Sequence, residues 1–286
     1  MDGCRVIPEP QRTYLLELLH TLGSAADEFV VAGAQAMKFM VERARATKDV
    51  DFVLDVVKLR GEPFSLGAQL QKLGYSVVDG SRNFQFEKPI PNSPETMRIE
   101  FMAPEEFKRE KDFRVDIQNG VHARACAGGA IAVAESEIHQ LAGRLPDGSE
   151  FAASLRVTKP HALVMLKLLA LDDRYRNIRG PAEAQHDREE ARTHAADIVA
   201  IISAQRHLAE FRKAFQRQFE FDPPLGERVS HILEEYFREN VSAGMLVYEE
   251  FLIADKPLDR DSRREVAQEV ERAYRLMTRM AATMRG

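Results

Sequence analysis

Two aspartates, Asp49 and Asp51, stand at the head of an apolar run that continues to Leu54. Successive side chains of a strand point to opposite faces, so these two carboxylates lie on the same side. At about 5 Å, two negative charges repel each other by roughly 3 kcal/mol at an effective dielectric constant near 20. A divalent cation reverses the sign of this term, and Mg²⁺ prefers one or two carboxylates plus substrate phosphates. The pair indicates either a metal site or a solvated strand end.

A third acid, Glu100, lies in a later β-forming segment, residues 97–102. In a half-buried strand an acid must either face solvent or have a cationic partner. If this strand lies beside the one that carries the two aspartates, Glu100 completes a cluster of three carboxylates. The alternative is an ion pair with Arg98 or another nearby base on the exposed face.

A glycine stands at the junction of a predicted strand and a predicted helix. Residues 29–32 are apolar β-formers, and Gly33 leads into good helix formers through about residue 43. Glycine lets the backbone come close to a phosphate, and the N–H groups at the start of a helix can bind an anion. The junction therefore indicates either a phosphate-binding turn or a glycine required for packing.

Two charged residues lie in apolar helical segments of the second half of the chain. Lys167 lies within an almost wholly apolar helix that is predicted to begin at Pro160. Taken alone, it reads as a lysine that extends its charged end to the surface from a partly buried helix. Asp197 stands at the head of another apolar run, where an acid can simply complement the helix dipole.

The elements that must position these residues follow from hydrophobic periodicity and from turn residues. Helical spacing over residues 11–22 predicts a helix that ends at Gly23, and residues 146–149 (Pro-Asp-Gly-Ser) predict the turn of a β-hairpin. Pro223, Pro224 and Pro257 break the helical C-terminal region. Further helices are predicted over residues 66–73, 208–219, 225–240 and 263–284, and strands over 75–78, 84–88, 97–102, 137–145 and 150–157.

Composition and charge narrow the class of protein. The chain has 286 residues, of which 44% are hydrophobic and 30% charged, as in ordinary globular proteins. With a net charge of −5, the surface as a whole does not indicate nucleic-acid binding, which would need a local basic patch. The C-terminal segment, with Arg272, Arg275, Arg279 and Arg285, is locally basic, although a solvated helix face is the simpler interpretation.

Neither the cysteines nor the most polar segment predicts a metal site. The two cysteines, Cys4 and Cys126, suit neither a disulfide framework nor a zinc site, which fits a reducing cytoplasm. Residues 186–190 (His-Asp-Arg-Glu-Glu) predict a solvated loop or helix start, because their spacing is poor for metal ligands. The sequence shows no signal peptide and no apolar stretch long enough to span a membrane, so we expect a cytoplasmic protein.

In chain order these features resemble the DNA polymerase-β-like nucleotidyltransferase superfamily. Residues 33–36 (Gly-Ala-Gln-Ala), Arg45 and residues 47–51 (Thr-Lys-Asp-Val-Asp) resemble the "GG-x-A … R-x-T-x-D-x-D" opening of the AbiEii/AbiGii-type toxin nucleotidyltransferases. Residues 167–170 (Lys-Leu-Leu-Ala) with Arg174 match the family's "K-h-h-A" motif and its following arginine, where h is apolar. Asp197 matches the acid that the family carries about one helix later.

One position departs from the family pattern. The second small residue of the usual Gly-Gly or Gly-Ser pair is Ala34, which has no hydroxyl to contact a phosphate. The backbone approach is preserved if Ala34 has a negative φ. This departure keeps open a non-enzymatic binding module with a degraded phosphate loop.

The resemblance implies an α+β fold, with a nucleotidyltransferase-type mixed sheet, flanking helices and a helical C-terminal region. It implies a catalytic domain over residues 1–157 and a helical domain over 158–286 that contributes Lys167 and Asp197 to the cleft. The catalytic residues would be Asp49, Asp51, Glu100, Lys167 and Asp197. The nucleotide would be bound by Gly33, Ala34, Gln35, Arg45, Thr47, Lys48, Lys167 and Arg174.

The same resemblance implies a chemistry. Asp49, Asp51 and Glu100 would bind one or two Mg²⁺ (or Mn²⁺) ions, and Glu100 could instead take the proton of the acceptor hydroxyl. Lys167 would bind phosphate as a point charge, and Asp197 would orient Lys167 or contact the nucleotide. A nucleotidyl group would pass from an NTP to an acceptor, with release of pyrophosphate.

The acceptor is not determined by the resemblance, because fold analogy does not fix a substrate. AbiEii-like relatives act as toxins paired with an antitoxin, some of them on tRNA ends, so RNA and a cognate antitoxin are the expected partners. A small-molecule enzyme that nucleotidylates an aminoglycoside-like acceptor is the alternative. A basic groove would favour RNA and an acidic pocket the small molecule. The oligomeric state is left open.

Overall fold

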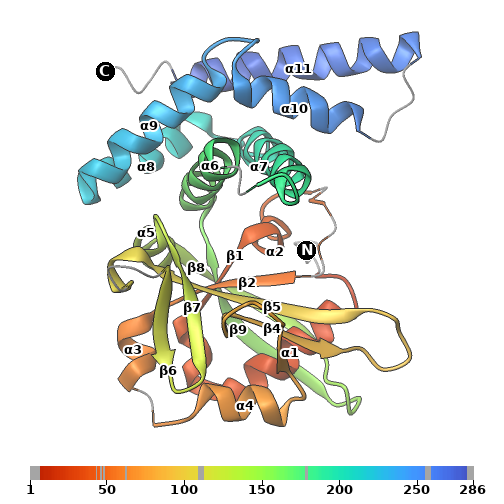
Figure 1. The fold of residues 1–286 in the computed structure, drawn as a ribbon, viewed down its shortest axis with the longest axis vertical. Coiled ribbons are helices and arrows are strands. Elements are labelled where there is room, and N and C mark those ends of the chain that lie inside the picture. The colour runs from red at the N-terminus through yellow and green to blue at the C-terminus, as the bar shows by residue number, and fades with distance from the viewer. Residues whose placement is uncertain are drawn as a thin grey trace. The chain divides into compact units, whose positions relative to one another are not determined.

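The chain forms two units, residues 1–159 and 160–286. The computed structural model, drawn in Figure 1, describes residues 7–42, 44–45, 47, 49–61, 63–108, 113–177, 180–254 and 259–281. The boundary between the units falls two residues after the one that the sequence predicts. Each unit has its own set of buried apolar side chains and is described by itself.

The first unit is an open mixed sheet with flanking helices, which confirms the predicted α+β class. Its described strands form one nine-stranded sheet in the order β3-β4-β5-β2-β1-β9-β8, and β7 pairs with both β5 and β6. The strands are β1 (Phe29–Ala32), β2 (Asp49–Leu54), β3 (Ser76–Val77), β4 (Gln85–Pro89), β5 (Thr96–Pro104), β6 (Arg114–Gln118), β7 (Val121–Cys126), β8 (Ser136–Arg144) and β9 (Glu150–Thr158). The helices are α1 (Gln11–Leu22), α2 (Gly33–Met37), α3 (Val56–Gly61), α4 (Leu66–Lys72) and α5 (Gly129–Ala134), with 3-10 turns η1 (Gly23–Glu28) and η2 (Glu105–Phe107).

An aromatic core on one face holds the central strands together. Phe29, Phe52 and Phe101 come from β1, β2 and β5, and each is at most 1% exposed. The ring centroid of Phe29 lies 5.6 Å from that of Phe52 and 5.9 Å from that of Phe101, and both contacts are edge-on. Burying each ring contributes roughly 1.5–3 kcal/mol. Because side chains alternate along a strand, anchoring these rings directs the neighbouring residues Asp51 and Glu100 to the opposite face.

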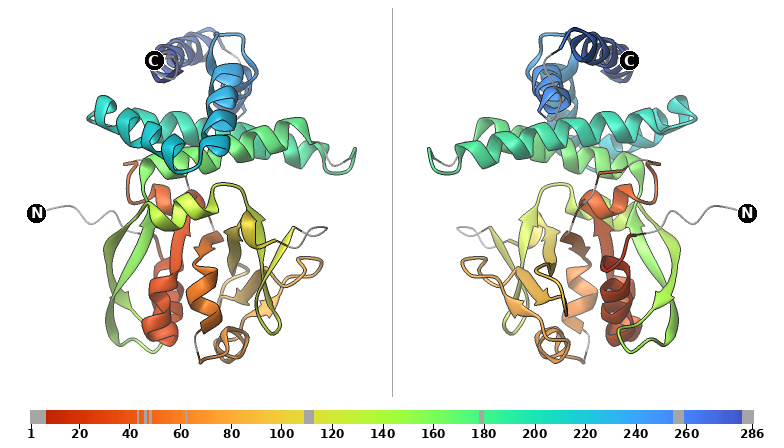
Figure 2. Two further views of the ribbon diagram at one scale, coloured as in Figure 1. Left: turned by 90° about the vertical axis from the view of Figure 1, so that its left-hand side faces the viewer. Right: turned by 90° about the vertical axis from the view of Figure 1, so that its right-hand side faces the viewer.

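The predicted hairpin is confirmed. Strands β8 and β9 pair antiparallel from Ser136↔Thr158 to Arg144↔Glu150, with the Pro-Asp-Gly-Ser turn between them. The hairpin lies beside α1 in both views of Figure 2. Helix α1 ends at Leu22, and the glycine that follows adopts φ +56°, as its predicted role at the helix end requires.

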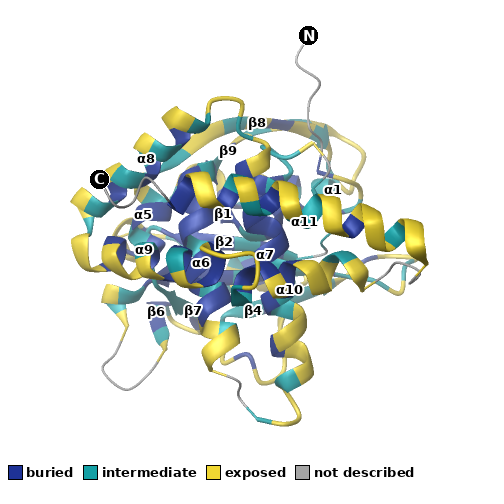
Figure 3. Ribbon diagram, turned by 90° about the horizontal axis from the view of Figure 1, so that it is seen from above, coloured by how far each residue is buried: buried dark blue, intermediate teal, exposed yellow. Residues whose placement is uncertain are grey.

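The second unit is helical, as predicted. Its helices are α6 (Pro160–Arg176), α7 (Ala184–Ser203), α8 (Leu208–Phe221), α9 (Pro223–Phe237), α10 (Ala243–Ile253) and α11 (Arg260–Ala281). Asp222 caps α9 by accepting a hydrogen bond from the backbone N–H of Leu225 at 3.2 Å. Figure 3 shows buried stretches on α6 and α7 and a mostly exposed α11. None of the helices in the described ranges combines the length and apolar character needed to cross a bilayer.

Several short elements differ from the sequence-based expectation. Helix α2 ends at Met37 and is followed by turns, whereas the sequence predicts a helix through about residue 43. The run Val56–Gly61, the pair β6 and β7, and helices α5 and α10 are not predicted. Apart from α10, which has 11 residues, these segments have only five or six residues, too few periodic positions to distinguish a strand from a helix. One of these missed strands, β7, supplies a residue of the candidate site.

Candidate functional site

Strand pairing places Glu100 beside the two aspartates. Strands β2 and β5 pair in parallel, with Asp49 opposite Arg98 and Asp51 opposite Glu100. Paired residues on neighbouring parallel strands point to the same face, and the strands lie about 4.8 Å apart. The condition that the sequence left open is therefore met, because the carboxylates of Asp49, Asp51 and Glu100 belong to one face of the sheet.

Asp51 fills a hollow that only a glycine can leave open. In the antiparallel pairing of β1 and β2, Ala32 lies opposite Asp51, and the chain then turns at Gly33 with φ +59°. A Cβ atom at position 33 would lie 1.7 Å from Asp51 Oδ2. Both the backbone conformation and this contact therefore require glycine. Ala34 lies within helix α2, so its φ is negative and the close backbone approach is preserved.

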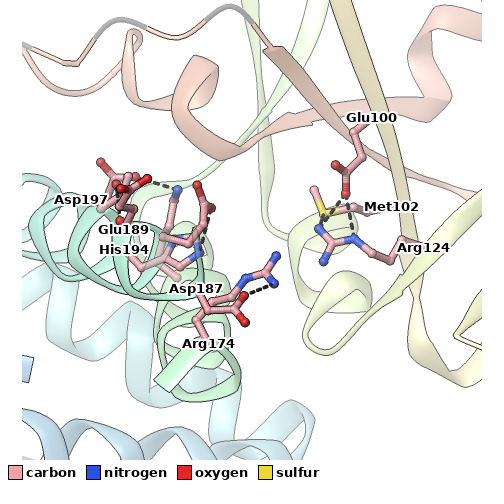
Figure 4. Close-up of polar contacts among 11 residues, drawn as sticks. Glu100, Met102, Arg124, Arg174, Asp187, Glu189, His194 and Asp197 are labelled. Carbon is pink, nitrogen blue, oxygen red and sulfur yellow. Dashed lines mark hydrogen bonds and ion pairs between the residues drawn. The ribbon is translucent and has the colours of Figure 1, made fainter. Parts of the chain in front are cut away.

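Glu100 is held by two side chains that the sequence analysis did not predict. Gln85 Nε2 on β4 donates a 2.7 Å hydrogen bond to Glu100 Oε2. Arg124 on β7 donates from Nε to Oε1 at 2.7 Å, and its Nη2 lies 2.6 Å from the same oxygen. Figure 4 shows this ion pair with Met102 beside it. Arg98, the base that the sequence analysis names, instead pairs with Glu87 at 3.1 Å, so the other nearby base that it left open is Arg124.

The negative charges of the neighbouring carboxylates affect the pKa of Arg124. The charge of Glu100, the largest cause, raises the pKa of Arg124 above its ordinary value; burial acts in the opposite direction, and Asp51 adds a smaller upward contribution. The signal that could have revealed this residue is the alternation of buried Val121 and Ala123 with His122 and Arg124, which is typical of a strand. The sequence does not show that this strand pairs with β5.

The other predicted nucleotide-binding residues of the first unit lie close to the β1–β2 connection. The Asp49 N–H donates to Thr47 Oγ1 at 3.3 Å, which fixes the entry of the chain into β2. Burial, and secondarily the charge of Arg45, lowers the pKa of Lys38. Gln35 is fully buried in α2, and within the described structure neither polar atom of its amide forms a hydrogen bond. Lys48 lies outside the described residues.

In the second unit, Lys167 and Asp197 form a buried ion pair. Lys167 Nζ lies 2.7 Å from Asp197 Oδ2, and the two side chains are only 7% and 3% exposed. The interpretation of Lys167 as a side chain that reaches the surface is therefore wrong. The helix of Asp197 packs along the helix of Lys167, so the acid faces a cation rather than complementing a helix end.

Arg174 has a buried partner as well. Its Nη1 lies 3.0 Å from Oδ1 of Asp187, whose side chain is fully buried (Figure 4). The prediction of a solvated segment over residues 186–190 is therefore wrong at Asp187, which lies on the side of α7 that faces α6. Lys167 precedes Arg174 on α6, while their partners occur in the reverse order on α7, so the two helices run antiparallel. The two ion pairs, Lys167–Asp197 and Arg174–Asp187, fit only one register of α6 against α7.

The chemistry of the first unit's acids fits a magnesium ion. Among the residues that the structure describes, no group of three or more His, Cys, Asp or Glu side chains is arranged to hold a metal. Mg²⁺, however, is commonly bound through one or two carboxylates, with waters and substrate phosphates completing its octahedron. Asp49 and Asp51 supply hard oxygen donors on one face, and the Gly33 hollow seats one of them next to a backbone turn.

Comparison with known proteins gives matches over most of the chain. No curated protein matches this sequence. Among solved structures, the crystal structure of JHP933 from Helicobacter pylori is similar to 97% of this chain and 95% of its own, with a TM-score of 0.36 and 10% sequence identity. The family model described as "Nucleotidyl transferase AbiEii toxin, Type IV TA system" matches residues 17–284. The chain therefore belongs to the AbiEii nucleotidyl transferase toxin family of type IV toxin–antitoxin systems.

Proposed function

We propose that this protein is a metal-dependent enzyme that transfers a nucleotidyl group from an NTP to an acceptor hydroxyl. The observation that carries the proposal is the contact between Asp51 Oδ2 and the backbone turn at Gly33, with Asp49 on the same face of β2. This contact puts two carboxylates and a turn that tolerates no side chain at one point of the sheet. In a nucleotidyl transferase family, carboxylates for a cation beside a backbone surface for phosphate are what the reaction needs.

The proposal gives each residue of the first unit a role. Asp49 and Asp51 would hold the Mg²⁺ (or Mn²⁺) ion, and the backbone at Gly33 would lie along the triphosphate. When bound, the ion would offset the negative charge on the oxygens that attack and leave the phosphorus. Glu100 would serve either as a further ligand of the ion or as the base that takes the proton from the acceptor hydroxyl.

In the transfer itself, the acceptor oxygen forms a bond to the α-phosphorus as the bond from that phosphorus to the bridging oxygen breaks. Pyrophosphate leaves, and the hydroxyl proton passes to a base. Lys167 would bind phosphate as a point charge, and Asp197 would orient it, a role supported by their 2.7 Å contact. Arg174, which the family motif also assigns to the nucleotide, is held by Asp187.

We further propose that the acceptor is RNA, such as the end of a tRNA, and that a cognate antitoxin opposes the enzyme. The family description supports the toxin role. The structure offers less support for a basic RNA-binding stripe on α11, since Arg272 and Arg275 pair with Glu269 and Glu271 of the same helix. That helix therefore presents mixed charge, and the RNA assignment is drawn from the family.

The metal assignment is tested by titrating the protein with a non-hydrolysable ATP analogue, with and without Mg²⁺. We expect the wild type to bind only when the metal is present, because like charges would otherwise repel the triphosphate from the aspartate pair. The Asp49→Ala/Asp51→Ala variant should lose that metal-dependent binding. Asp55→Ala is the matched control, since it removes an acid next to β2 that pairs with Lys58 at 3.2 Å. Metal-dependent binding that persists in the double variant would reject the assignment.

A further inference from the structure

We infer that Arg124 is a built-in counter-ion that holds Glu100 in the metal-free protein and releases it as a ligand when a divalent cation binds. This inference rests on the proposed metal-dependent function and chooses between the two roles left open for Glu100. Arg124 acts through Glu100 and is therefore a positioning residue. If so, the affinity of the protein for the metal depends on whether the Arg124 guanidinium or the metal ion binds the Glu100 carboxylate.

Strand pairing brings Arg124 into direct contact with Glu100. Strand β7 pairs in parallel with β5, and Arg124 lies opposite Met102, two residues beyond Glu100 on the same face. From there the guanidinium reaches back so that Nε and Nη2 lie 2.7 and 2.6 Å from Glu100 Oε1. The thioether sulfur of Met102 lies 3.7 Å from Nη2 and supports this orientation.

Both oxygens of Glu100 are engaged in this arrangement. Arg124 takes Oε1, Gln85 donates to Oε2 at 2.7 Å, and the Glu100 side chain is 14% exposed. A carboxylate bound in this way has little freedom to turn toward Asp51, its neighbour on β2. The Arg124 side chain is 40% exposed, so part of it already lies at the surface.

Charge balance explains why such a counter-ion is needed. Asp49, Asp51 and Glu100 gather negative charge on one face, and nearby like charges oppose folding unless a cation lies among them. Arg124 supplies positive charge at Glu100 while no metal is present. A divalent ion would supply more positive charge than one arginine. The Arg124 guanidinium and the metal ion would therefore compete for Glu100. With Glu100 withheld, the metal has two protein carboxylates and depends on nucleotide phosphates to complete its coordination.

A purely structural ion pair makes a different prediction. If Arg124 only braces β7 against β5, removing it lowers stability and leaves the affinity for metal unchanged. If Arg124 competes with the metal, removing it lowers the stability of the metal-free protein and tightens metal binding at the same time. The opposite signs of these two effects distinguish the alternatives, and neither measurement requires turnover.

The experiment measures Mn²⁺ binding to the full chain by electron paramagnetic resonance, without nucleotide, in the wild type and in Arg124→Gln. We expect Arg124→Gln to bind Mn²⁺ roughly tenfold more tightly, because metal affinity follows the number of charged ligands available. Arg98→Gln is the matched control. It removes an arginine from the same face, opposite Asp49, without freeing Glu100, and should change the affinity less.

A second variant separates ligand release from a general change in charge. In the Glu100→Gln background, Arg124→Gln should no longer tighten Mn²⁺ binding, because the freed ligand is absent. Tightening that persists in that background would overturn the inference, as would unchanged or weaker binding in Arg124→Gln alone. If Arg124→Gln does not fold, Arg124→Lys decides. Lysine keeps the charge but not the paired N–H donors, so a smaller tightening supports the inference and none opposes it.

The outcome also separates this inference from the proposed function. Wild-type binding that requires Asp49 and Asp51, with Arg124→Gln unchanged, defeats the inference and leaves the proposed function standing. Absence of Mn²⁺ binding in every variant, Arg124→Gln included, defeats the inference alone. Metal-dependent nucleotide binding that is retained in Asp49→Ala/Asp51→Ala defeats the metal assignment and the inference together.

Discussion

Gly33 shows how one residue can carry two separate constraints. Its φ of +59° disfavours any other residue, and its missing Cβ leaves the space that Asp51 Oδ2 occupies. The first constraint is a property of the local turn, whereas the second depends on a residue of another strand. A substitution at this position therefore changes the backbone and displaces the carboxylate that we assign to the metal.

We expect Gly33→Ala to lower the free energy of unfolding by more than the roughly 1–3 kcal/mol that a left-handed alanine alone costs. It should also abolish metal-dependent nucleotide binding, because Asp51 must move. Gly23→Ala is a matched control, since Gly23 has φ +56° and nothing within 4 Å of an added Cβ. Urea denaturation and nucleotide titration of both variants provide the measurement. Equal losses of stability in the two variants would show that the contact with Asp51 has no energetic weight.

At the scale of elements, helices α6 and α7 are joined by charges as well as by apolar packing. Lys167–Asp197 and Arg174–Asp187 cross between these antiparallel helices, and three of the four side chains are at most 7% exposed. Buried ion pairs add little net stability compared with apolar residues of similar size, but losing one partner leaves an uncompensated charge. Charges buried at this cost are consistent with a use other than stability.

Asp197→Ala should destabilise the protein by about 3–5 kcal/mol, because Lys167 would be left in an apolar interior without its partner. The double variant Lys167→Met/Asp197→Leu should recover most of that loss while nucleotide transfer stays abolished. Urea denaturation checks the stability and release of pyrophosphate checks the transfer. Full transfer activity in the double variant would show that the pair is only structural.

At the scale of the whole molecule, charge constrains the acceptor. The net charge is −5, and Arg272 and Arg275 of α11 pair with glutamates of the same helix, so the protein does not attract nucleic acid through a strong overall field. An RNA acceptor must then be chosen by local contacts at the site. Because fold and family leave the acceptor open, it must be determined directly.

We expect label from α-³²P-labelled NTPs to enter RNA when the protein is incubated with total RNA and Mg²⁺. An aminoglycoside panel in place of RNA should receive none. Gel electrophoresis and thin-layer chromatography follow the label, and Asp49→Ala/Asp51→Ala serves as the inactive control. Label on an aminoglycoside would favour the small-molecule alternative, and label on neither acceptor would oppose both.

Much of the architecture was determined by the sequence alone. The helix ending at Gly23, the hairpin around the Pro-Asp-Gly-Ser turn, the strand with Asp49 and Asp51 on one face, and the helical second half all depend on periodicity and turn residues within a few positions of each other. Local patterns of this kind can be recognised in a single sequence. The order of the motifs was also enough to predict the family to which the chain belongs.

Only the tertiary structure decided which distant residues meet. Three features depend on the register between separate elements: the contact between Gly33 and Asp51, the ion pair between Arg124 and Glu100, and the burial of Asp187. Register is set by packing of the whole core, since shifting a strand by one residue would reverse the face of every side chain on it. For that reason the sequence could name the acids of the candidate site but could not identify the arginine that pairs with Glu100.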